Sequence, residues 1–203
     1  MREIEARDAL AEFSRRLYDR RLTFYAGGNM SIRTSEGFLI TPSGRCKGLL
    51  TAEDMVPLNA DGSVRGDGRP SVETPVHLAI YGAKGDVDAI VHCHPPHCTA
   101  LAVRGEGMRT RLTPEGVLLL GDVPMVPYHA PGSEGLADDV VRMMDGPAVL
   151  MARHGALTVG RDLEEAYNRM EEMEFQAMLQ ILSAGAEDLP EAEVRAIRGD
   201  KSI

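Results

Sequence analysis

The sequence predicts a mixed α/β protein, because helix-like and strand-like patterns follow one another along the chain. Residues 3–20 carry apolar side chains at helical spacing. Residues 147–152, and the segment that leads into His92, form short apolar runs of the kind found in buried strands. The chain has 203 residues, which is enough to bury a sizeable core. We therefore expect one domain over residues 1–203.

The N-terminal third is expected to fold as a helix followed by a β-hairpin. The helix over 3–20 has one apolar face, made by Leu10, Phe13, Leu17 and Tyr18. Residues 30–33 and 38–41 alternate apolar and polar side chains, as strands do, and turn residues occupy 35–37 between them. This hairpin leads into a loop of small residues at 41–44.

The central third is expected to hold a helix, a buried strand and a second helix. Ser71 is predicted to cap the first helix. A pair of prolines ends the strand that carries His92, because proline lacks the N–H that a central strand needs. The same prolines can open a helix over 97–103, which Gly105 closes. The histidines of this segment therefore lie where a strand gives way to a helix.

The segment after that second helix is expected to be irregular until a capped helix begins. Residues 106–111 are predicted to form a loop. Residues 123–128 are predicted to form a short edge strand, because two prolines interrupt them. Ser133 is predicted to cap a helix that extends to about Met144.

The C-terminal third is expected to add one long strand and the longest helix. Residues 147–152 form an apolar strand, and residues 156–159 are predicted to continue it past His154. Asp162 is a good cap for the helix that follows. The apolar stripe of that helix comprises Leu163, Tyr167, Met170, Met173, Ala177, Met178 and Ile181. The polar tail from Glu187 is expected either to fold over a site or to fray.

Composition excludes several classes of function. Lys plus Arg number 22 against 31 Asp plus Glu, so the formal charge is −9, which is unsuited to nucleic acid or to an anionic membrane. No apolar segment approaches the roughly 18–20 residues that cross a bilayer. Three cysteines without a C-x-x-C pair argue against a disulfide scaffold or a cysteine-rich zinc site. The first five residues are charged where a signal peptide would be apolar, so we expect a cytoplasmic protein.

A metal site is the first chemical hypothesis. His92 and His94 are spaced i, i+2 on a predicted strand, so both imidazoles point to the same side. His154, also at the end of an apolar strand, is the best third ligand, with His97 and His129 as rivals. Three imidazoles leave an open position, as in catalytic zinc sites, although they suit cobalt, nickel and manganese equally. The alternative is a set of packed or solvated histidines.

Two small-residue loops suggest an anion site. The segment around Gly28 and Asn29 and the loop at 41–44, together with Ser71, are rich in N–H and hydroxyl donors and could cradle a phosphate. The alternative is that they are simply turn residues. Glu73 is expected near a helix N-terminus, where the dipole favours its carboxylate, and by itself it could be an ordinary first-turn acid.

Two further residue types bear on mechanism. His77, one turn after Glu73, is expected to be a packed or supporting histidine rather than a ligand. The lysines are Lys47, Lys84 and Lys201, and none has an obviously buried context.

Five motifs together resemble the class II aldolase/adducin family, and in particular its L-fuculose-1-phosphate aldolases. The motifs, in family order, are Gly27–Arg33, Ile40–Gly44, Ser71–Glu73, Val91–His94 and Arg153–Gly155. The resemblance implies a three-layer α/β/α sandwich with a central, mostly antiparallel sheet. It also implies a homotetramer with active sites near subunit boundaries.

The resemblance also implies roles for individual residues. His92, His94 and His154 would bind a divalent metal, with zinc expected. Glu73 would be the acid/base and, without substrate, a fourth ligand. The residues that would hold the substrate phosphate are Gly28, Asn29, Ser43, Gly44 and Ser71.

The reaction implied is cleavage of a ketose 1-phosphate, such as L-fuculose 1-phosphate, to dihydroxyacetone phosphate and an aldehyde through an enediolate. A metal acting as a Lewis acid stabilises such charge, so no Schiff-base lysine is required. One departure concerns the proton donor, because the fuculose-phosphate enzymes have a Tyr from a neighbouring subunit near the position of Thr113, and no Tyr is close by here.

Four alternatives remain open. Glu115 resembles a catalytic Glu of methylthioribulose-1-phosphate dehydratases in the same superfamily, and it could equally be a turn acid. Ribulose-5-phosphate 4-epimerases have a shorter Asp where Glu73 stands. Decarboxylases of phosphorylated oxo-acids are a third possibility. Adducin-like members are non-enzymatic interaction modules that lack the metal histidines.

Overall fold

A seven-stranded sheet organises the protein, which is described here by a computed structural model covering residues 2–199. The sheet order is β3-β2-β1-β4-β7-β6-β5, and every neighbouring pair is antiparallel except β5 and β6. The strands are β1 (Asn29–Thr34), β2 (Gly37–Ile40), β3 (Val56–Leu58), β4 (Ala89–Cys93), β5 (Met125–Val126), β6 (Ala148–Met151) and β7 (Gly155–Gly160). The hairpin and the short edge strand expected from the sequence are both confirmed.

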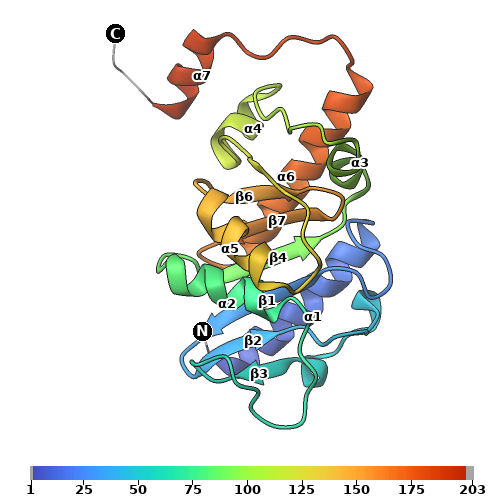
Figure 1. Ribbon diagram of the computed structural model, residues 1–203, viewed down its shortest axis with the longest axis vertical. Coiled ribbons are helices and arrows are strands. Elements are labelled where there is room, and N and C mark those ends of the chain that lie inside the picture. Colours follow the sequence, from blue (N-terminus) through green and yellow to red (C-terminus); the bar gives the residue numbers. More distant parts are fainter. Residues whose placement is uncertain (1, 200–203) are drawn as a thin grey trace.

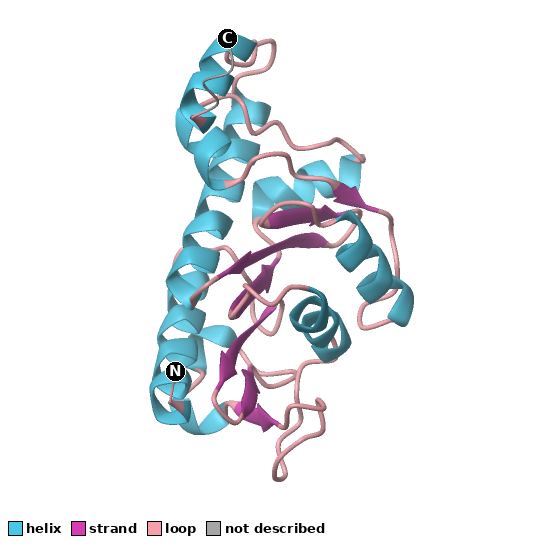
Figure 2. Cartoon of the chain, turned by 90° about the vertical axis from the view of Figure 1, so that its left-hand side faces the viewer, coloured by secondary structure: helices cyan, strands magenta, loops and turns pink. Residues whose placement is uncertain are grey.

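Helices cover both faces of the sheet, which gives the α/β/α sandwich that the family resemblance implied (Figure 1; Figure 2). The helices are α1 (Glu3–Asp19), α2 (Thr74–Ala83), α3 (Pro96–Arg104), α4 (Pro114–Leu119), α5 (Glu134–Met143), α6 (Leu163–Leu182) and α7 (Glu191–Arg198), with short 3-10 helices η1 (Lys47–Leu49) and η2 (Ala52–Asp54).

Alternation along the central strand explains the two layers. Val91 and Cys93 of β4 belong to the core shared with α1, α3 and α6, whereas Ile90 belongs to the core shared with α2 and α5. Because successive strand residues point to opposite faces, His92 lies on the same face as Ile90, beneath α2. The polar side chains of the site therefore collect on the α2 side of the sheet.

The prediction of one long strand across His154 is wrong. The chain reverses at Arg153 and His154, and β6 and β7 form an antiparallel hairpin in which Met151 pairs with Gly155. Arg153 takes a left-handed φ of 57°, which makes the reversal tight. Apolar runs lie on both sides of this turn, so no change of polarity marked it.

Three smaller expectations also need correction. Ser71 is not the N-cap of α2, because the helix begins at Thr74 and Glu73 occupies the N-cap position. Residues 114–119 form the short helix α4, which was not predicted because it begins with a proline and contains a glycine. Tyr18 is 41% exposed and so does not share the buried face of α1.

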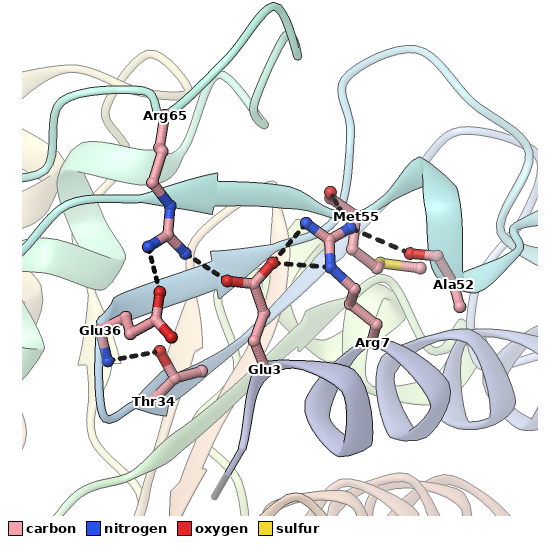
Figure 3. A network of polar contacts seen from close by, with 7 residues as sticks. All are labelled: Glu3, Arg7, Thr34, Glu36, Ala52, Met55 and Arg65. Atoms are coloured by element: carbon pink, nitrogen blue, oxygen red, sulfur yellow. Dashed lines mark hydrogen bonds and ion pairs between the residues drawn. The ribbon is translucent and has the colours of Figure 1, made fainter.

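A polar network fixes the N-terminal end of α1 against the β3 edge of the sheet (Figure 3). Glu3 pairs with Arg7 one turn along the helix and with Arg65 from the loop after β3. Arg65 also binds Glu36 at 2.6 Å. The Arg7 guanidinium donates to the Met55 carbonyl at 2.9 Å, so one helix end is tied to three segments.

The tail forms a helix in its described part. Val194 of α7 is fully buried, and α7 packs against α4 at the upper end of the molecule, away from β4 (Figure 1). Arg111 pairs with Glu191 at 2.9 Å across this contact. Among residues 2–199, no helix combines the length and the apolar character needed to span a bilayer.

Candidate metal and phosphate site

Three histidines from two distant segments converge at the end of β4. His92 lies on β4, His94 follows its last residue, and His154 lies in the β6–β7 turn. β4 and β7 are neighbours with Cys93 opposite Ala156, which brings the turn beside the strand end. One ring nitrogen from each histidine lies within 4.8 Å of the others. The convergence needed for a shared metal ion is therefore present.

Two glycines permit this close approach. A Cβ on Gly155 would lie 2.5 Å from the Cys93 carbonyl oxygen and 2.7 Å from Cδ2 of His94. A Cβ on Gly28 would lie 2.5 Å from the His92 carbonyl oxygen, and Gly28 also has a φ of 69°. Side chains at either position would push the backbone away from the histidines.

The orientation of His92 is set by its neighbour strand. Its Nδ1 lies 2.8 Å from the Ala156 carbonyl oxygen, which can only accept a hydrogen bond. Nδ1 therefore carries the proton, and in the neutral ring Nε2 presents its lone pair. A carbonyl that fixes the tautomer in this way is the usual support of a metal-binding histidine.

Glu73 lies against the same histidines. It is buried at the N-cap of α2, with Oε2 3.0 Å from His92 Nε2 and Oε1 3.3 Å from His154 Nε2. Burial opposes ionisation, but His92, His154 and a hydrogen bond from Asn29 outweigh it and hold the pKa of Glu73 well below its usual range. Burial likewise opposes a positive charge on His92. The Glu73 carboxylate outweighs this effect, so the pKa of His92 is raised.

The donor set fits a divalent cation. Buried ring nitrogens of all three histidines lack a hydrogen-bond partner among the described residues: His92 Nε2, His94 Nε2 and His154 Nδ1. Burial, reinforced by His92, lowers the pKa of His94 to about 3 and that of His154 to about 4. Both are therefore neutral at pH 7, which is the form that binds metal.

The rival ligands and Glu115 lie elsewhere. His97 binds Glu174 of α6 through Nδ1 at 2.7 Å, and His129 binds Asp139 of α5 at 2.8 Å. Glu115 is exposed on the first turn of α4 and does not belong to the histidine group. Burial raises the pKa of Glu172 on α6, and the Glu115 carboxylate adds to that effect. Among residues 2–199, no hydrogen bond or ion pair joins Glu115 to Glu73 or to the three histidines.

The expected phosphate-binding segments come together beside the histidines. Ser43 N donates to the Arg69 carbonyl at 3.0 Å, and Ser71 N donates to the Thr41 carbonyl at 3.2 Å. These bonds join the loop at 41–44 to the residues before α2, while Thr41 N bonds the Met30 carbonyl of β1. The N–H groups of Ser43 and Ser71 are thus already used. Their hydroxyl groups, with the N–H groups of Gly28 and Gly44, would be the remaining donors to a phosphate.

Lys47 is a feature that sequence reasoning missed. Only 2% of it is exposed, contrary to the expectation that none of the lysines is buried, and Lys201 lies outside the described residues. Its Nζ donates to the carbonyls of Ala26 and Arg45 at 3.1 and 3.3 Å, so it joins the glycine loop to the loop at 41–44. Burial lowers the pKa of Lys47 to about 8, so it remains mainly cationic at pH 7. Among residues 2–199 it forms no ion pair.

Asn29 has a role that the sequence did not predict. Its Nδ2 donates to Glu73 Oε2 at 2.7 Å, and its Oδ1 lies 2.6 Å from His77 Nε2. The side-chain amide is thus engaged with the acid/base candidate and not only with a prospective phosphate. Glu73 and His77 lie four residues apart on the turn that opens α2, and this spacing is the sequence signal that could have revealed their common neighbour.

Comparisons with known proteins agree with this architecture. Residues 8–181 match the model of the class II aldolase and adducin N-terminal domain. An L-fuculose phosphate aldolase of Methanocaldococcus jannaschii is 34% identical over 83% of this chain and 92% of its own. A 3-oxo-tetronate 4-phosphate decarboxylase of Haemophilus influenzae is 32% identical over 88% of both chains.

A solved structure is similar over nearly the whole length. YgbL from Escherichia coli, named as an aldolase, epimerase or decarboxylase, superposes with a TM-score of 0.91 at 31% identity and covers 97% of this chain and 99% of its own. The family model spans all seven strands and the three histidines. The chain therefore belongs to the class II aldolase and adducin N-terminal domain family.

Proposed function

We propose that the protein is a metal-dependent lyase that cleaves a ketose 1-phosphate of the L-fuculose 1-phosphate type to dihydroxyacetone phosphate and an aldehyde. The observation that carries the proposal is the position of Glu73, whose two carboxylate oxygens face His92 and His154 at 3.0 and 3.3 Å. This proximity supports a joint role in which Glu73 would be the acid/base group and the three histidines would bind the metal.

The triad would hold a divalent ion, for which zinc is our choice. His92, His94 and His154 would be its ligands, with Glu73 as a further ligand before substrate binds. A bound divalent ion supplies Lewis acidity, which stabilises negative charge that develops on carbonyl and hydroxyl oxygens.

Glu73 would move the proton that the reaction requires. Its carboxylate is held ionised, so it is a base, and a base is what removes a proton from the carbon beside a carbonyl. In the cleavage direction the C4 hydroxyl would pass its proton to the Glu73 carboxylate and its oxygen would become that of the aldehyde, while the bond between C3 and C4 breaks and the electron pair stays on the three-carbon fragment. The proton on the Glu73 carboxyl group then goes to C3 of that fragment, which completes dihydroxyacetone phosphate.

The phosphate would be held by the loops around Gly28, Asn29, Ser43, Gly44 and Ser71. Lys47 supports this assignment, because a buried ammonium that has only carbonyl partners is stabilised when an anion binds nearby. The phosphate grip uses binding energy remote from the reacting carbons to fix their position.

A second candidate is decarboxylation of a 3-oxo-tetronate 4-phosphate, the reaction named for one relative. There the bond between C1 and C2 breaks, CO2 leaves, and the electron pair stays on the same three-carbon phosphate fragment, whose C2 then takes up a proton from water. This reaction needs no group to exchange a proton with a departing aldehyde oxygen. The absence of a Tyr near Thr113 in the sequence favours it, as does the finding that Glu73 is the one carboxylate paired with the triad among the described residues.

Because both routes yield dihydroxyacetone phosphate, one coupled assay with a dehydrogenase detects either. Purified protein would be incubated with L-fuculose 1-phosphate and, separately, with 3-oxo-tetronate 4-phosphate, with Glu73→Gln protein as the matched control. Product from the first substrate supports the aldolase. Product with CO2 from the second alone would move the assignment to the decarboxylase. No product from either, with loss of water from methylthioribulose 1-phosphate, would indicate a dehydratase.

We also propose that the active form is a homotetramer. Large apolar side chains are exposed on the segments that hold the site: Tyr25 before the glycine loop is 70% exposed, and Val72 beside Ser71 is 57% exposed. A neighbouring subunit that covers them would also enclose the substrate. Light scattering that gives a monomer mass for active protein would contradict this.

A further inference from the structure

We infer that a buried chain of hydrogen bonds, running from Tyr81 through Ser31 and His77 to Asn29, sets the direction of the Asn29 amide and so positions Glu73. Only the kinetic test of this inference rests on the proposed function. The direction of the chain can be measured on the protein without any substrate.

The chain of hydrogen bonds is continuous from Tyr81 to Glu73. The Tyr81 hydroxyl lies 2.8 Å from Ser31 Oγ, and Ser31 Oγ lies 2.7 Å from His77 Nδ1. His77 Nε2 lies 2.6 Å from Asn29 Oδ1, and Asn29 Nδ2 lies 2.7 Å from Glu73 Oε2. Each contact is within ordinary hydrogen-bond distance.

The donor and the acceptor of each hydrogen bond follow from Glu73, at the end of the chain. A carboxylate only accepts, so Asn29 must present its NH2 group to Glu73 and its oxygen to His77. His77 Nε2 must then carry a hydrogen and donate it to Asn29 Oδ1. In a neutral ring Nδ1 is then an acceptor, so the Ser31 hydroxyl donates to it. The Ser31 oxygen in turn accepts from Tyr81, and every donor therefore points toward the acid/base group.

The fold supplies these groups in register. Asn29 pairs with His92 across β1 and β4, and Ser31 pairs with Ile90, so both side chains lie on the face that α2 covers. His77 and Tyr81 are one turn apart on α2, and Glu73 precedes them by the same interval. Each member of the chain is at most 4% exposed.

Burial makes the chain costly to break. Water cannot replace a lost partner there, so a missing bond leaves a buried polar atom unsatisfied. Burial also lowers the pKa of His77 to about 3 and raises that of Tyr81, so the imidazole stays neutral and the phenol keeps its proton. Both groups are therefore in the forms that the chain requires.

Two substitutions of His77 separate positioning from mere packing. His77→Leu removes both bonds, leaves Asn29 Oδ1 without its partner, and so loosens the amide that holds Glu73. His77→Gln can keep both bonds, because its NH2 can donate to Asn29 while its oxygen accepts from Ser31. We expect His77→Leu to lower kcat about 10- to 100-fold with KM little changed, as for partners that orient active-site groups, and His77→Gln to recover most of the loss.

The first measurement is nitrogen-15 NMR of the imidazole side chains in the metal-loaded protein. The expected result is a neutral His77 with its hydrogen on Nε2, assigned by comparison with His77→Gln. A hydrogen on Nδ1, or a charged ring at pH 7, overturns the inference whatever reaction the protein catalyses.

The second measurement is the kinetic comparison, with metal content and thermal unfolding recorded for each variant. Equal kcat losses in His77→Leu and His77→Gln, at full metal content, overturn the positioning role. If His77→Leu does not fold, Ser31→Ala takes its place, and an unchanged Nε2–H population together with an unchanged kcat in that variant would also overturn it. If neither proposed substrate is turned over, the proposed function fails, while the NMR result still decides the direction of the chain.

Discussion

Glu73 Oε2 lies 3.0 Å from His92 Nε2, while Nδ1 of the same ring is held by the Ala156 carbonyl oxygen. With Nδ1 carrying the proton of a neutral imidazole, a lone pair faces a carboxylate. Two acceptors at this distance repel unless a positive charge accompanies them, in the form of a proton on Nε2 or a bound cation. His94 and His154 contribute neutral imidazoles to the same place, which favours the cation.

Metal removal is the first prediction. Dialysis against a chelator should abolish turnover, and addition of zinc or another divalent first-row ion should restore it, because one buried nitrogen of each triad histidine lacks a hydrogen-bond partner among the described residues. In His94→Ala the same addition should fail. His129→Ala, which loses the contact with Asp139 and leaves the group of three histidines intact, is the control and should be restored like the wild type.

Replacing the acid/base is the second prediction. Glu73→Gln should keep its metal, because three imidazoles remain, while turnover falls about 10²- to 10⁴-fold, the usual contribution of a positioned acid or base. Metal analysis and steady-state kinetics on one preparation check both parts. A rate close to that of the wild type would remove Glu73 from the mechanism.

The pH dependence of stability is the third prediction. The pKa of His77 is about 3 in the folded chain, against an ordinary value of 6.5. A lowered histidine pKa means that the unfolded chain binds the proton first, so this stability is complete above pH 6.5 and is lost as the pH falls. At pH 5 the loss is about 2 kcal/mol.

Urea unfolding of metal-free protein at pH 7.5 and pH 5 measures this contribution. The free energy of unfolding should fall by about 2 kcal/mol more in the wild type than in His77→Gln, because the other titrating groups are common to both. Equal losses would show that His77 is not held neutral by burial.

The fourth prediction concerns the buried lysine, Lys47. Lys47→Met keeps a long apolar stem and removes the charge that joins Ala26 to Arg45. We expect a higher KM for the phosphorylated substrate and weaker inhibition by inorganic phosphate. Lys84→Met, at the C-terminal end of α2, is the control and should leave both unchanged. A phosphate inhibition constant unaltered by Lys47→Met would exclude a role in anion binding.

Local patterns explain how much of the fold was predictable. The β1–β2 hairpin and the start of α3 were predicted because turn residues and prolines mark them in the sequence. The reversal at His154 was not, because apolar residues on both sides of a two-residue turn look like one strand. Helix α4 was missed because six residues with a proline and a glycine carry little helical signal.

The candidate site was also predictable only in part. His92 and His94 could be paired from their spacing alone, since a strand places alternate residues on one face. The burial of Lys47 could not be predicted, because it depends on carbonyl groups from the glycine loop, which is distant in the sequence. The contact of Asn29 with His77 likewise depends on how α2 crosses β1.

The metal content of purified wild-type protein and of His154→Ala is the most direct test of the central claim. His154 comes from a turn about sixty residues beyond the other two ligands, so only the folded chain can join them. Elemental analysis should find one divalent first-row ion per chain in the wild type and little or none in a folded His154→Ala protein. Equal metal in both proteins, or none in an active wild type, would contradict the account.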